Sequence, residues 1–440
     1  MSAPHGPTTA TTLRHNPLNA VTATVERITD EAGRTYIRKE LRAPTQAPVA
    51  AGRAGARDAV GEVQALDAVG EAQAPVSGRA GAPDAAGRAR ARDAVGGAQA
   101  PEAVGRAGAP EAAGGVGGAR RLKASPVGSA GRGGRLRSGD AQASGVVGWA
   151  ASGELRHWNY WGREVEVYRD REWREGLAGT GLVLPEGEVE EYSGGAVLYL
   201  EDVVGKPGTE FSLADHAALA RACGRWQARP ALVRPWTSEG FLRDYSTTRV
   251  VPWELLGDDD AWKQPLVAEN WPVGLRDSWQ HLVAHRDELL TIVEQSPRAG
   301  CHLDLWVCNL IRRSDGEIAL LDWAFAGDGA VGEDLGNHIP DAVFDLFWPA
   351  ERLPELAETC IDNYLDGLRE GGWRGDPDVV RRAVMASTVK YAWLLPGLLG
   401  RASDPSHQAY HQEADSQHLF QQRGLALSFV ADWCAEALRG

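Results

Sequence analysis

Residues 301–309 read CHLDLWVCN, and residues 318–329 read IALLDWAFAGDG. The first stretch has the spacing HxDxxxxN, with Asp304 and Asn309 as its last two members, and Asp322 comes thirteen residues after Asn309. These polar residues lie among apolar neighbours, and a buried carboxylate costs free energy unless it is paired or bound to a cation. An Asn and an Asp joined by a hairpin can supply hard oxygen ligands to Mg²⁺, while another carboxylate stays free to take a hydroxyl proton. The pattern therefore predicts a site for magnesium and a nucleotide.

The HxDxxxxN stretch and the aspartate after it resemble the catalytic loop and hairpin of the aminoglycoside phosphotransferase family, whose small-molecule kinases share the protein-kinase fold. The resemblance is tight over residues 301–336 and looser over the rest of the chain outside a low-complexity segment. It implies that Asp304 orients or deprotonates the attacking hydroxyl. It also implies that Asn309 and Asp322 hold the Mg²⁺ ions that bridge the nucleotide phosphates.

The resemblance also implies how three other features of this stretch should be interpreted. The triplet that begins at Asp322 reads DWA, which departs from the DFG of protein kinases in a way that these small-molecule kinases also show. His302 is implied to be a scaffold residue. Asp334, in GEDLG, matches an acid that ties the loop to a neighbouring helix, so we expect it to serve structure rather than catalysis.

Near the start of the chain, two runs alternate small or apolar residues with polar ones. These runs are Ala20–Ile28 and Thr35–Leu41, and DEAG at Asp30–Gly33 separates them. The pattern predicts a β-hairpin. The resemblance implies that a strand of this lobe supplies a lysine for the phosphates, and Lys39 fits that place.

A glutamate on a helix of the same lobe should hold this lysine. Residues 157–174, HWNYWGREVEVYRDREWR, have helical spacing of their apolar side chains. Glu164 fits the expected place. Glu166 stays open as the alternative, because the two glutamates point to different faces of the helix and only one of them can face Lys39.

The hinge between the two lobes is expected at Leu198–Val204, which reads LYLEDVV. Backbone groups of such an extended segment can pair with an adenine edge, and Leu200, Glu201 and Asp202 are the expected cofactor-binding residues. The acid pair resembles the hinge of the family. A phosphate-covering turn should lie between the first two strands, yet residues 16–24 contain no glycine, so the sequence leaves this turn undefined.

Residues 45–148 are built almost wholly of Ala, Gly, Arg, Val, Pro, Gln, Ser, Asp and Glu, and they contain no aromatic residue. This composition cannot bury a core and predicts a disordered insertion. A tether or a nucleic-acid-binding arm that uses its arginines is the functional alternative. The expected division of the chain is 1–44 for the first strands of the N-lobe, 45–148 for the insertion, 149–205 for the rest of the N-lobe and the hinge, and 206–440 for the helical C-lobe.

The other expected elements come from apolar periodicity and capping residues. Short apolar runs predict strands at Leu182–Leu184 and Ala196–Leu200. Ser212, with Asp215 three residues later, is expected to begin a helix. Further helices are expected at Gly274–Gln295, Pro354–Arg369, Asp378–Leu399 and Ser416–Leu438, with a non-helical segment over 300–336.

The composition excludes several classes of protein. The 440 residues carry a formal net charge of −14, which argues against a broad nucleic-acid surface. The chain has no run of 18 apolar residues, and its start lacks the basic and apolar regions of a secretory signal, so we expect a cytoplasmic protein without a membrane span. Its five cysteines form no CxxC pair and predict buried or incidental thiols. Nothing in the sequence indicates an oligomeric state.

Three rival patterns favour ordinary structure over function. Gly327, Gly329 and Gly332 form GxGxxG, a dinucleotide-binding fingerprint, but they lie where a kinase-like hairpin needs turns. His407 and His411 could share a helix face as metal ligands, but no HExxH is present. The 16 tryptophans are scattered through expected helices, which favours core packing over base stacking.

We therefore expect an α+β protein with a bilobed protein-kinase-like fold, a small β-rich N-lobe and a large, mainly helical C-lobe. The expected reaction transfers the γ-phosphoryl group of ATP or GTP to a hydroxyl of a small molecule, an aminoglycoside or a related metabolite, bound near residues 236–271 and 391–418. The alternative is a catalytically inactive kinase-like scaffold that binds a nucleotide or a partner. The residues that flank Asp304 and Asp322 in the sequence offer no cation. This argues against the interpretation that the two aspartates are ordinary core residues held only by salt bridges.

Overall fold

The computed structural model describes residues 9–13, 21–44, 150–404, 407–409 and 412–440. The expected insertion at 45–148, most of the expected phosphate-covering turn and His411 lie outside these residues. No helix in the described part of the chain is long and apolar enough to cross a membrane.

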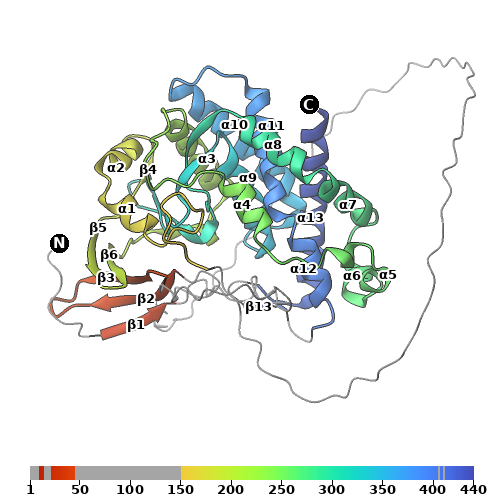
Figure 1. Cartoon of the computed structure of the whole chain (residues 1–440), viewed down its shortest axis with the longest axis horizontal. Helices are drawn as coiled ribbons and strands as arrows, with labels where there is room; N and C mark the ends of the chain where they lie inside the picture. The colour runs from red at the N-terminus through yellow and green to blue at the C-terminus, as the bar shows by residue number, and fades with distance from the viewer. Residues whose placement is uncertain (1–8, 14–20, 45–149, 405–406, 410–411) are drawn as a thin grey trace, which may run out of the picture. The chain divides into compact units, whose positions relative to one another are not determined.

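An antiparallel five-stranded sheet forms the N-lobe, in the order β1-β2-β3-β6-β5 (Figure 1). Its strands are β1 (Thr9–Leu13), β2 (Thr22–Thr29), β3 (Thr35–Arg42), β5 (Gly187–Tyr192) and β6 (Gly195–Glu201). The expected hairpin is confirmed as β2 and β3. Asp30 closes its turn, because Asp30 Oδ1 accepts hydrogen bonds from the backbone N–H groups of Ala32 and Arg34. Gly33 supplies the positive φ of 75° that the turn requires.

Strands β1 and β5 were not expected from the sequence. Their sequences, TATTL and GEVEEY, have mostly exposed or half-buried side chains and no apolar face that a pattern could reveal. Both lie at the edges of the sheet, where each pairs with a single neighbour. Strand β6, which the sequence did indicate, is central and largely buried.

Two short helices stand where one helix over residues 157–174 was expected, so the expectation of a single helix is wrong. They are α1 (Arg163–Arg169) and α2 (Arg171–Leu177). Asp170 separates them with extended backbone angles, φ −79° and ψ 102°, and its carboxylate accepts a hydrogen bond from the Trp173 N–H. An aspartate in this conformation caps a new helix instead of continuing the old one.

Two small sheets frame the segment that carries the predicted chemistry. One has the order β4-β10-β9-β7, and the other pairs β8 with β11. Their strands are β4 (Leu182–Val183), β7 (Lys206–Pro207), β8 (Arg298–Cys301), β9 (Leu310–Arg312), β10 (Ile318–Leu320) and β11 (Gly327–Ala330). The strand expected at Leu182–Leu184 is thus confirmed as β4. Because β11 pairs antiparallel with β8, the three glycines of the GxGxxG pattern do not belong to a βαβ unit.

The C-lobe is mainly helical. Its helices are α3 (Leu213–Gln227), α4 (Phe241–Thr247), α5 (Asp259–Trp262), α6 (Pro265–Asn270), α7 (Leu275–Ala284), α8 (Arg286–Gln295), α9 (Glu333–Phe344), α10 (Leu353–Glu370), α11 (Pro377–Ser387), α12 (Leu394–Arg401) and α13 (Ser416–Arg439). The expected helices that begin after Ser212, at Pro354 and at Ser416 are confirmed as α3, α10 and α13. Ser212 and Asp215 form the expected capping box at the start of α3.

Three expected boundaries are wrong. The helix expected at Gly274–Gln295 breaks at His285, where φ is −106° and ψ is 14°, into α7 and α8. The helix expected at Asp378–Leu399 is divided into α11, a 3₁₀ segment (Thr388–Tyr391) and α12, because Pro396 has no N–H for a helix running through this region. The non-helical segment ends at Gly332, since α9 begins at Glu333.

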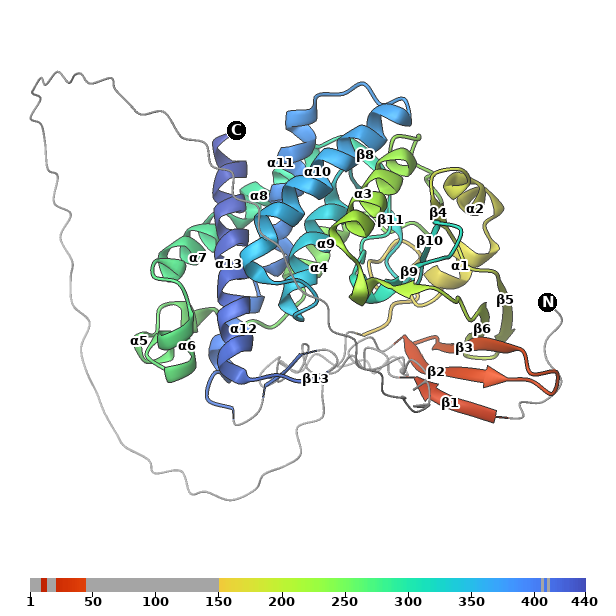
Figure 2. The same cartoon turned by 180° about the vertical axis from the view of Figure 1, so that it is seen from behind.

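Helices α3 and α10 pack with their backbones in close contact (Figure 2). Two glycines permit this approach, one from each helix. A Cβ on Gly224 would clash with the carbonyl oxygen of Tyr364, and a Cβ on Gly367 would clash with that of Arg221. The pair of helices forms a rigid support, which carries Gln227 at the end of α3.

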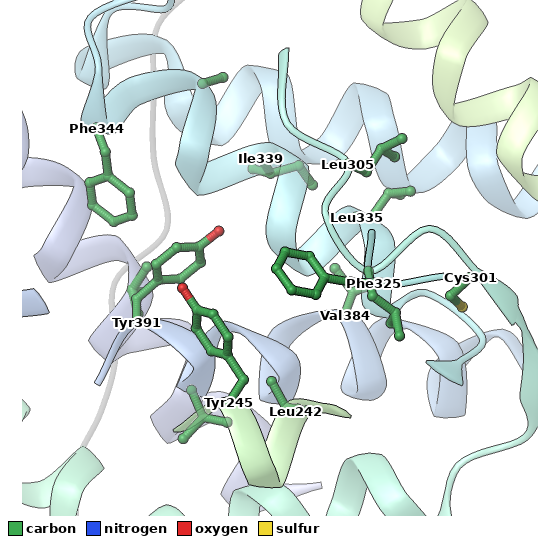
Figure 3. Close-up of a cluster of buried hydrophobic side chains, with 14 of the residues drawn as sticks. Leu242, Tyr245, Cys301, Leu305, Phe325, Leu335, Ile339, Phe344, Val384 and Tyr391 are labelled. Carbon is green, nitrogen blue, oxygen red and sulfur yellow. The ribbon is translucent and has the colours of Figure 1, made fainter. Parts of the chain in front are cut away.

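Apolar side chains from the N-lobe, the C-lobe helices and residues 299–331 form one continuous core. Leu305 is next to Asp304 in sequence, and Phe325 comes three residues after Asp322. Figure 3 shows these two side chains gathered with Leu335 and Ile339 of α9. The described cysteines are free thiols, and four of the five are buried, which confirms that expectation. Many tryptophans are buried in this core, as expected from their scatter through the sequence.

Candidate active site

The HxDxxxxN loop starts where β8 ends, and His302 fastens it to the segment before Asp322. His302 Nε2 lies 2.9 Å from the carbonyl oxygen of Leu321, and Nδ1 accepts a hydrogen bond from the Asp304 N–H at 3.3 Å. Burial lowers the pKa of His302, so the ring is neutral and Nε2 carries the proton that it donates. The ring also packs against Trp323, with 4.6 Å between centroids. His302 thus joins the two stretches that carry the chemistry.

Asp334 fixes the same loop from the start of α9. Its carboxylate accepts hydrogen bonds from the backbone N–H groups of His302 at 3.0 Å and Leu303 at 2.7 Å. It also accepts one from Gln227 Nε2 at 2.6 Å, which links the loop to α3. Leu303 has a φ of 64°, a conformation that costs a leucine energy and that these hydrogen bonds help to hold.

Beside Asp334, Glu333 is buried, and its Oε2 accepts a hydrogen bond from the Ala330 N–H at 2.8 Å. Burial raises the pKa of Glu333 from 4.5 to about 7. Between pH 4.5 and about pH 7, Glu333 is ionised in the unfolded chain but still protonated in the folded chain. The free energy of unfolding therefore falls as the pH rises through this range.

We predict that Glu333→Gln stabilises the protein by about 2–3 kcal/mol at pH 8 and hardly at all at pH 4.5. The amide can still accept the Ala330 hydrogen bond but carries no charge to bury. Urea unfolding of the variant and the wild type at both pH values measures this difference, with exposed Glu358→Gln as the control. A stability difference that is the same at both pH values would contradict the prediction.

Asp304 lies in the loop with its side chain 27% exposed. Asn309 Nδ2 donates to the Asp304 carbonyl oxygen at 3.0 Å and lies 3.3 Å from Asp304 Oδ2. Burial raises the pKa of Asp304 to about 6, against the opposing effect of the nearby Lys390 ammonium. At pH 8 the group is therefore a carboxylate that can accept a proton.

Asp322, Lys39 and Glu164 meet although they come from three distant parts of the chain. Lys39 Nζ lies 2.7 Å from Glu164 Oε2 and 2.9 Å from Asp322 Oδ1. Lys39 and Glu164 are buried, whereas the Asp322 side chain is 38% exposed. Burial alone would lower the pKa of Lys39, but the two carboxylates raise it, so the ammonium stays charged. Of the two candidate glutamates, Glu164 is the one that pairs with Lys39, and Glu166 is half-buried.

The backbone at Asp322 is left-handed, with a φ of 57°. Trp323 locks this conformation, because its indole is fully buried against Trp173 and Trp226, with 6.0 and 5.8 Å between centroids, and its Nε1 donates to the Leu320 carbonyl. Asn309 is held close by, since its carbonyl oxygen accepts a hydrogen bond from the Leu321 N–H at 2.9 Å. Packing thus fixes the direction of the Asp322 side chain.

Asn309 and Asp322 fit a magnesium site by the chemistry of their donor atoms. The amide nitrogen of Asn309 is directed at Asp304, which leaves its amide oxygen as the available ligand atom. Asp322 uses Oδ1 toward Lys39, and its exposed carboxylate retains a second oxygen. One amide and one carboxylate oxygen match the preference of Mg²⁺, which keeps its other positions for water and phosphate oxygens.

The expected hinge residues lie at the end of β6, and residues 202–204 form neither helix nor strand. Leu200 is buried. The Glu201 carboxylate pairs with Arg313, and the Asp202 carboxylate binds Arg27 at 2.9 Å. These two side chains therefore tie the end of β6 to the N-lobe strand β2, through Arg27, and to the turn between β9 and β10, through Arg313.

Two basic residues beside the site were missed. Arg163, which precedes Glu164, is fully buried and donates hydrogen bonds to the carbonyl oxygens of Trp236 and Ala324. It ties α1 to the segment after Asp322. Lys390 lies 3.8 Å from Asp304 Oδ1, and its one sequence signal was a lysine inside the apolar run VKYAWLL.

Residues 162–375 match the family model described as the phosphotransferase enzyme family, a range that includes Glu164, Asp304, Asn309 and Asp322. No curated protein matches the chain.

Similar solved structures include three kinases. An amicoumacin kinase solved with AMP-PNP, Ca²⁺ and Ami is 15% identical, with 61% of this chain and 78% of that chain covered and a TM-score of 0.38. An aminoglycoside phosphotransferase from Streptomyces rimosus, solved with ADP and streptomycin, is 20% identical, with coverage of 53% and 81% and a TM-score of 0.33. A choline/ethanolamine kinase family protein from Mesorhizobium loti is 18% identical, with coverage of 63% and 84% and a TM-score of 0.37.

Proposed function

We propose that the protein transfers the γ-phosphoryl group of ATP or GTP to a hydroxyl of a small molecule, because residues 162–375 match the phosphotransferase enzyme family. The observation that carries this proposal is the contact of Lys39 Nζ with two carboxylates, Glu164 Oε2 at 2.7 Å and Asp322 Oδ1 at 2.9 Å. A buried ammonium shared by two carboxylates, one of them partly exposed, provides a positive charge for phosphates beside an oxygen ligand for their counterion.

Each residue then has a distinct role in the transfer. Lys39, held by Glu164, contacts the nucleotide phosphates. Asp304 orients the acceptor hydroxyl and takes its proton. Asn309 and Asp322 would hold Mg²⁺, which when bound neutralises the negative charge on the phosphates. The chain contributes positioning and charge, without a covalent intermediate on the enzyme.

The acceptor is proposed to be an aminoglycoside or a related hydroxyl-bearing metabolite, recognised by side chains of residues 236–271 and 391–418. Helix α4 lies in the first of these segments, and the aromatic rings of Tyr245 and Tyr391 come from the two segments (Figure 3). Both tyrosines are buried, and the centroid of the Tyr245 ring lies 5.1 Å from Lys390 Nζ.

A thermal-shift titration tests the nucleotide site. We predict that ATP or GTP raises the Tm of the wild type only when Mg²⁺ is present, because a ligand that binds the folded state alone stabilises it by mass action. At a nucleotide concentration of about 100 times Kd, the stabilisation is about 2.7 kcal/mol. In Asp322→Asn this Mg²⁺-dependent stabilisation should disappear.

The matched control is Asp328→Asn. Asp328 is also a partly buried, ion-paired aspartate, bound to Arg298 at 3.1 Å, but it lies on β11 away from Lys39. It should keep the full Mg²⁺-dependent shift. Binding without turnover toward any acceptor would favour the inactive scaffold, and an absence of any nucleotide shift in the wild type would contradict the proposed site.

A further inference from the structure

Lys390 projects from the 3₁₀ segment Thr388–Tyr391, between α11 and α12. This segment packs against α4, α8, α9 and α13, and all four of its residues are buried. Side-chain exposure of Lys390 is 8%. Lysine almost never lies so deep without a partner, because an unpaired buried charge is costly.

The contacts of Lys390 lead to the HxDxxxxN loop. Its Nζ donates to Asn337 Oδ1 at 2.6 Å and lies 3.5 Å from the carbonyl oxygen of Leu303. Among the described residues, its ion pair is with Asp304, at 3.8 Å from Oδ1. The rings of Phe241 and Tyr245 cover the ammonium, with their centroids 5.7 and 5.1 Å away.

Another carboxylate, that of Asp341, is engaged elsewhere. It accepts a hydrogen bond from Asn337 Nδ2, while the Tyr391 hydroxyl donates to the Asn337 carbonyl oxygen at 2.9 Å. Asn337 thus holds both Asp341 and the ammonium of Lys390, so its amide keeps the two groups in fixed places. Lys390 is consequently oriented by a rigid α9 side chain toward Asp304.

The two oxygens of Asp304 each face one donor. Asn309 lies at Oδ2 and Lys390 lies on the side of Oδ1. We propose that Lys390 is a positioning residue for Asp304, which holds the carboxylate so that its remaining lone pairs meet the acceptor hydroxyl. This proposal rests on the proposed function. In the transfer, the hydroxyl proton passes to Asp304, the acceptor oxygen bonds to the γ-phosphorus, and the bond from that phosphorus to the β–γ bridging oxygen breaks. Lys390 neither gains nor loses a proton.

The test begins with Lys390→Met, which retains length and removes charge. We expect kcat to fall about tenfold to a hundredfold, since misplacement of a catalytic group by about 1 Å has such effects. The KM for the nucleotide should stay within about threefold, because Lys39 and Asp322 are untouched. Lys390→Gln, which can still donate to Asn337, is the second variant should the methionine disturb folding, and thermal denaturation establishes that each variant is folded.

A double-mutant cycle with Asp304→Asn separates positioning from general support. If Lys390 acts through Asp304, then Lys390→Met should lower the residual kcat of Asp304→Asn by less than about threefold, because residues that act as a unit are non-additive. The same tenfold or greater loss in both backgrounds would overturn the proposal, and so would a single variant with wild-type kcat.

Arg423→Met serves as the buried-cation control. Arg423 is 1% exposed and donates to the Phe344 carbonyl oxygen, away from Asp304. This variant should lose stability while its folded fraction keeps the wild-type kcat. A wild type that transfers phosphate to no acceptor would overturn the proposed function and this proposal together, whereas additivity in an active enzyme would overturn this proposal alone.

Discussion

Asp304→Asn is expected to lower kcat by about 10²–10⁴-fold, the contribution typical of a general base. The amide cannot take the hydroxyl proton, yet its oxygen can still accept the hydrogen bond from Asn309. Loop geometry should therefore survive, together with the contacts of His302 and Asp334 that do not involve the Asp304 carboxylate. Nucleotide affinity should change by less than about threefold, because Lys39 and Asp322 are unaltered.

Steady-state kinetics at pH 8 measures the effect, with nucleotide binding followed by thermal shift. At this pH the wild-type Asp304 is ionised, since its pKa is raised to about 6. Asp328→Asn is the control and should keep wild-type kcat. A kcat for Asp304→Asn within threefold of the wild type would show that this carboxylate is not the base.

Local sequence patterns were enough to locate several of the strands and helices. Alternation located β2, β3 and β6, and capping residues located α3. They failed where one residue changes the backbone direction, as at Asp170, which caps α2, and at Pro396, which helps to divide the helix expected at Asp378–Leu399. They also missed α9, because its sequence begins directly after the glycine-rich turn that ends with Gly332.

The candidate site combines residues that are close in sequence with residues that only the fold brings together. Asp304, Asn309 and Asp322 were recognisable because all three lie in one short stretch with fixed spacing. The cations that compensate them are distant in sequence. Lys39 reaches Asp322 across 283 residues, and Lys390 reaches Asp304 from the 3₁₀ segment between α11 and α12. No flanking residue could reveal these partners, which reach the site only through packing of β3 and of the 3₁₀ segment Thr388–Tyr391.

Lys39→Met is expected to remove about 3–5 kcal/mol from the free energy of unfolding, because it leaves Glu164 buried without a counter-charge. Glu164 is 2% exposed, so water cannot replace the ammonium, whereas Asp322 is exposed enough to be solvated. Transfer should also fall by at least about 100-fold, since the phosphates lose their positive partner.

The double variant Lys39→Met/Glu164→Gln separates these two losses. Removing both charges takes away the unpaired buried carboxylate, so stability should return to within about 1–2 kcal/mol of the wild type. Activity should remain lost, because no ammonium faces the phosphates. Urea unfolding and steady-state kinetics on the three proteins give both quantities. A double variant that regains activity with its stability would mean that Lys39 serves only the fold, whereas recovered stability without activity would place the ammonium of Lys39 in the chemistry of the site.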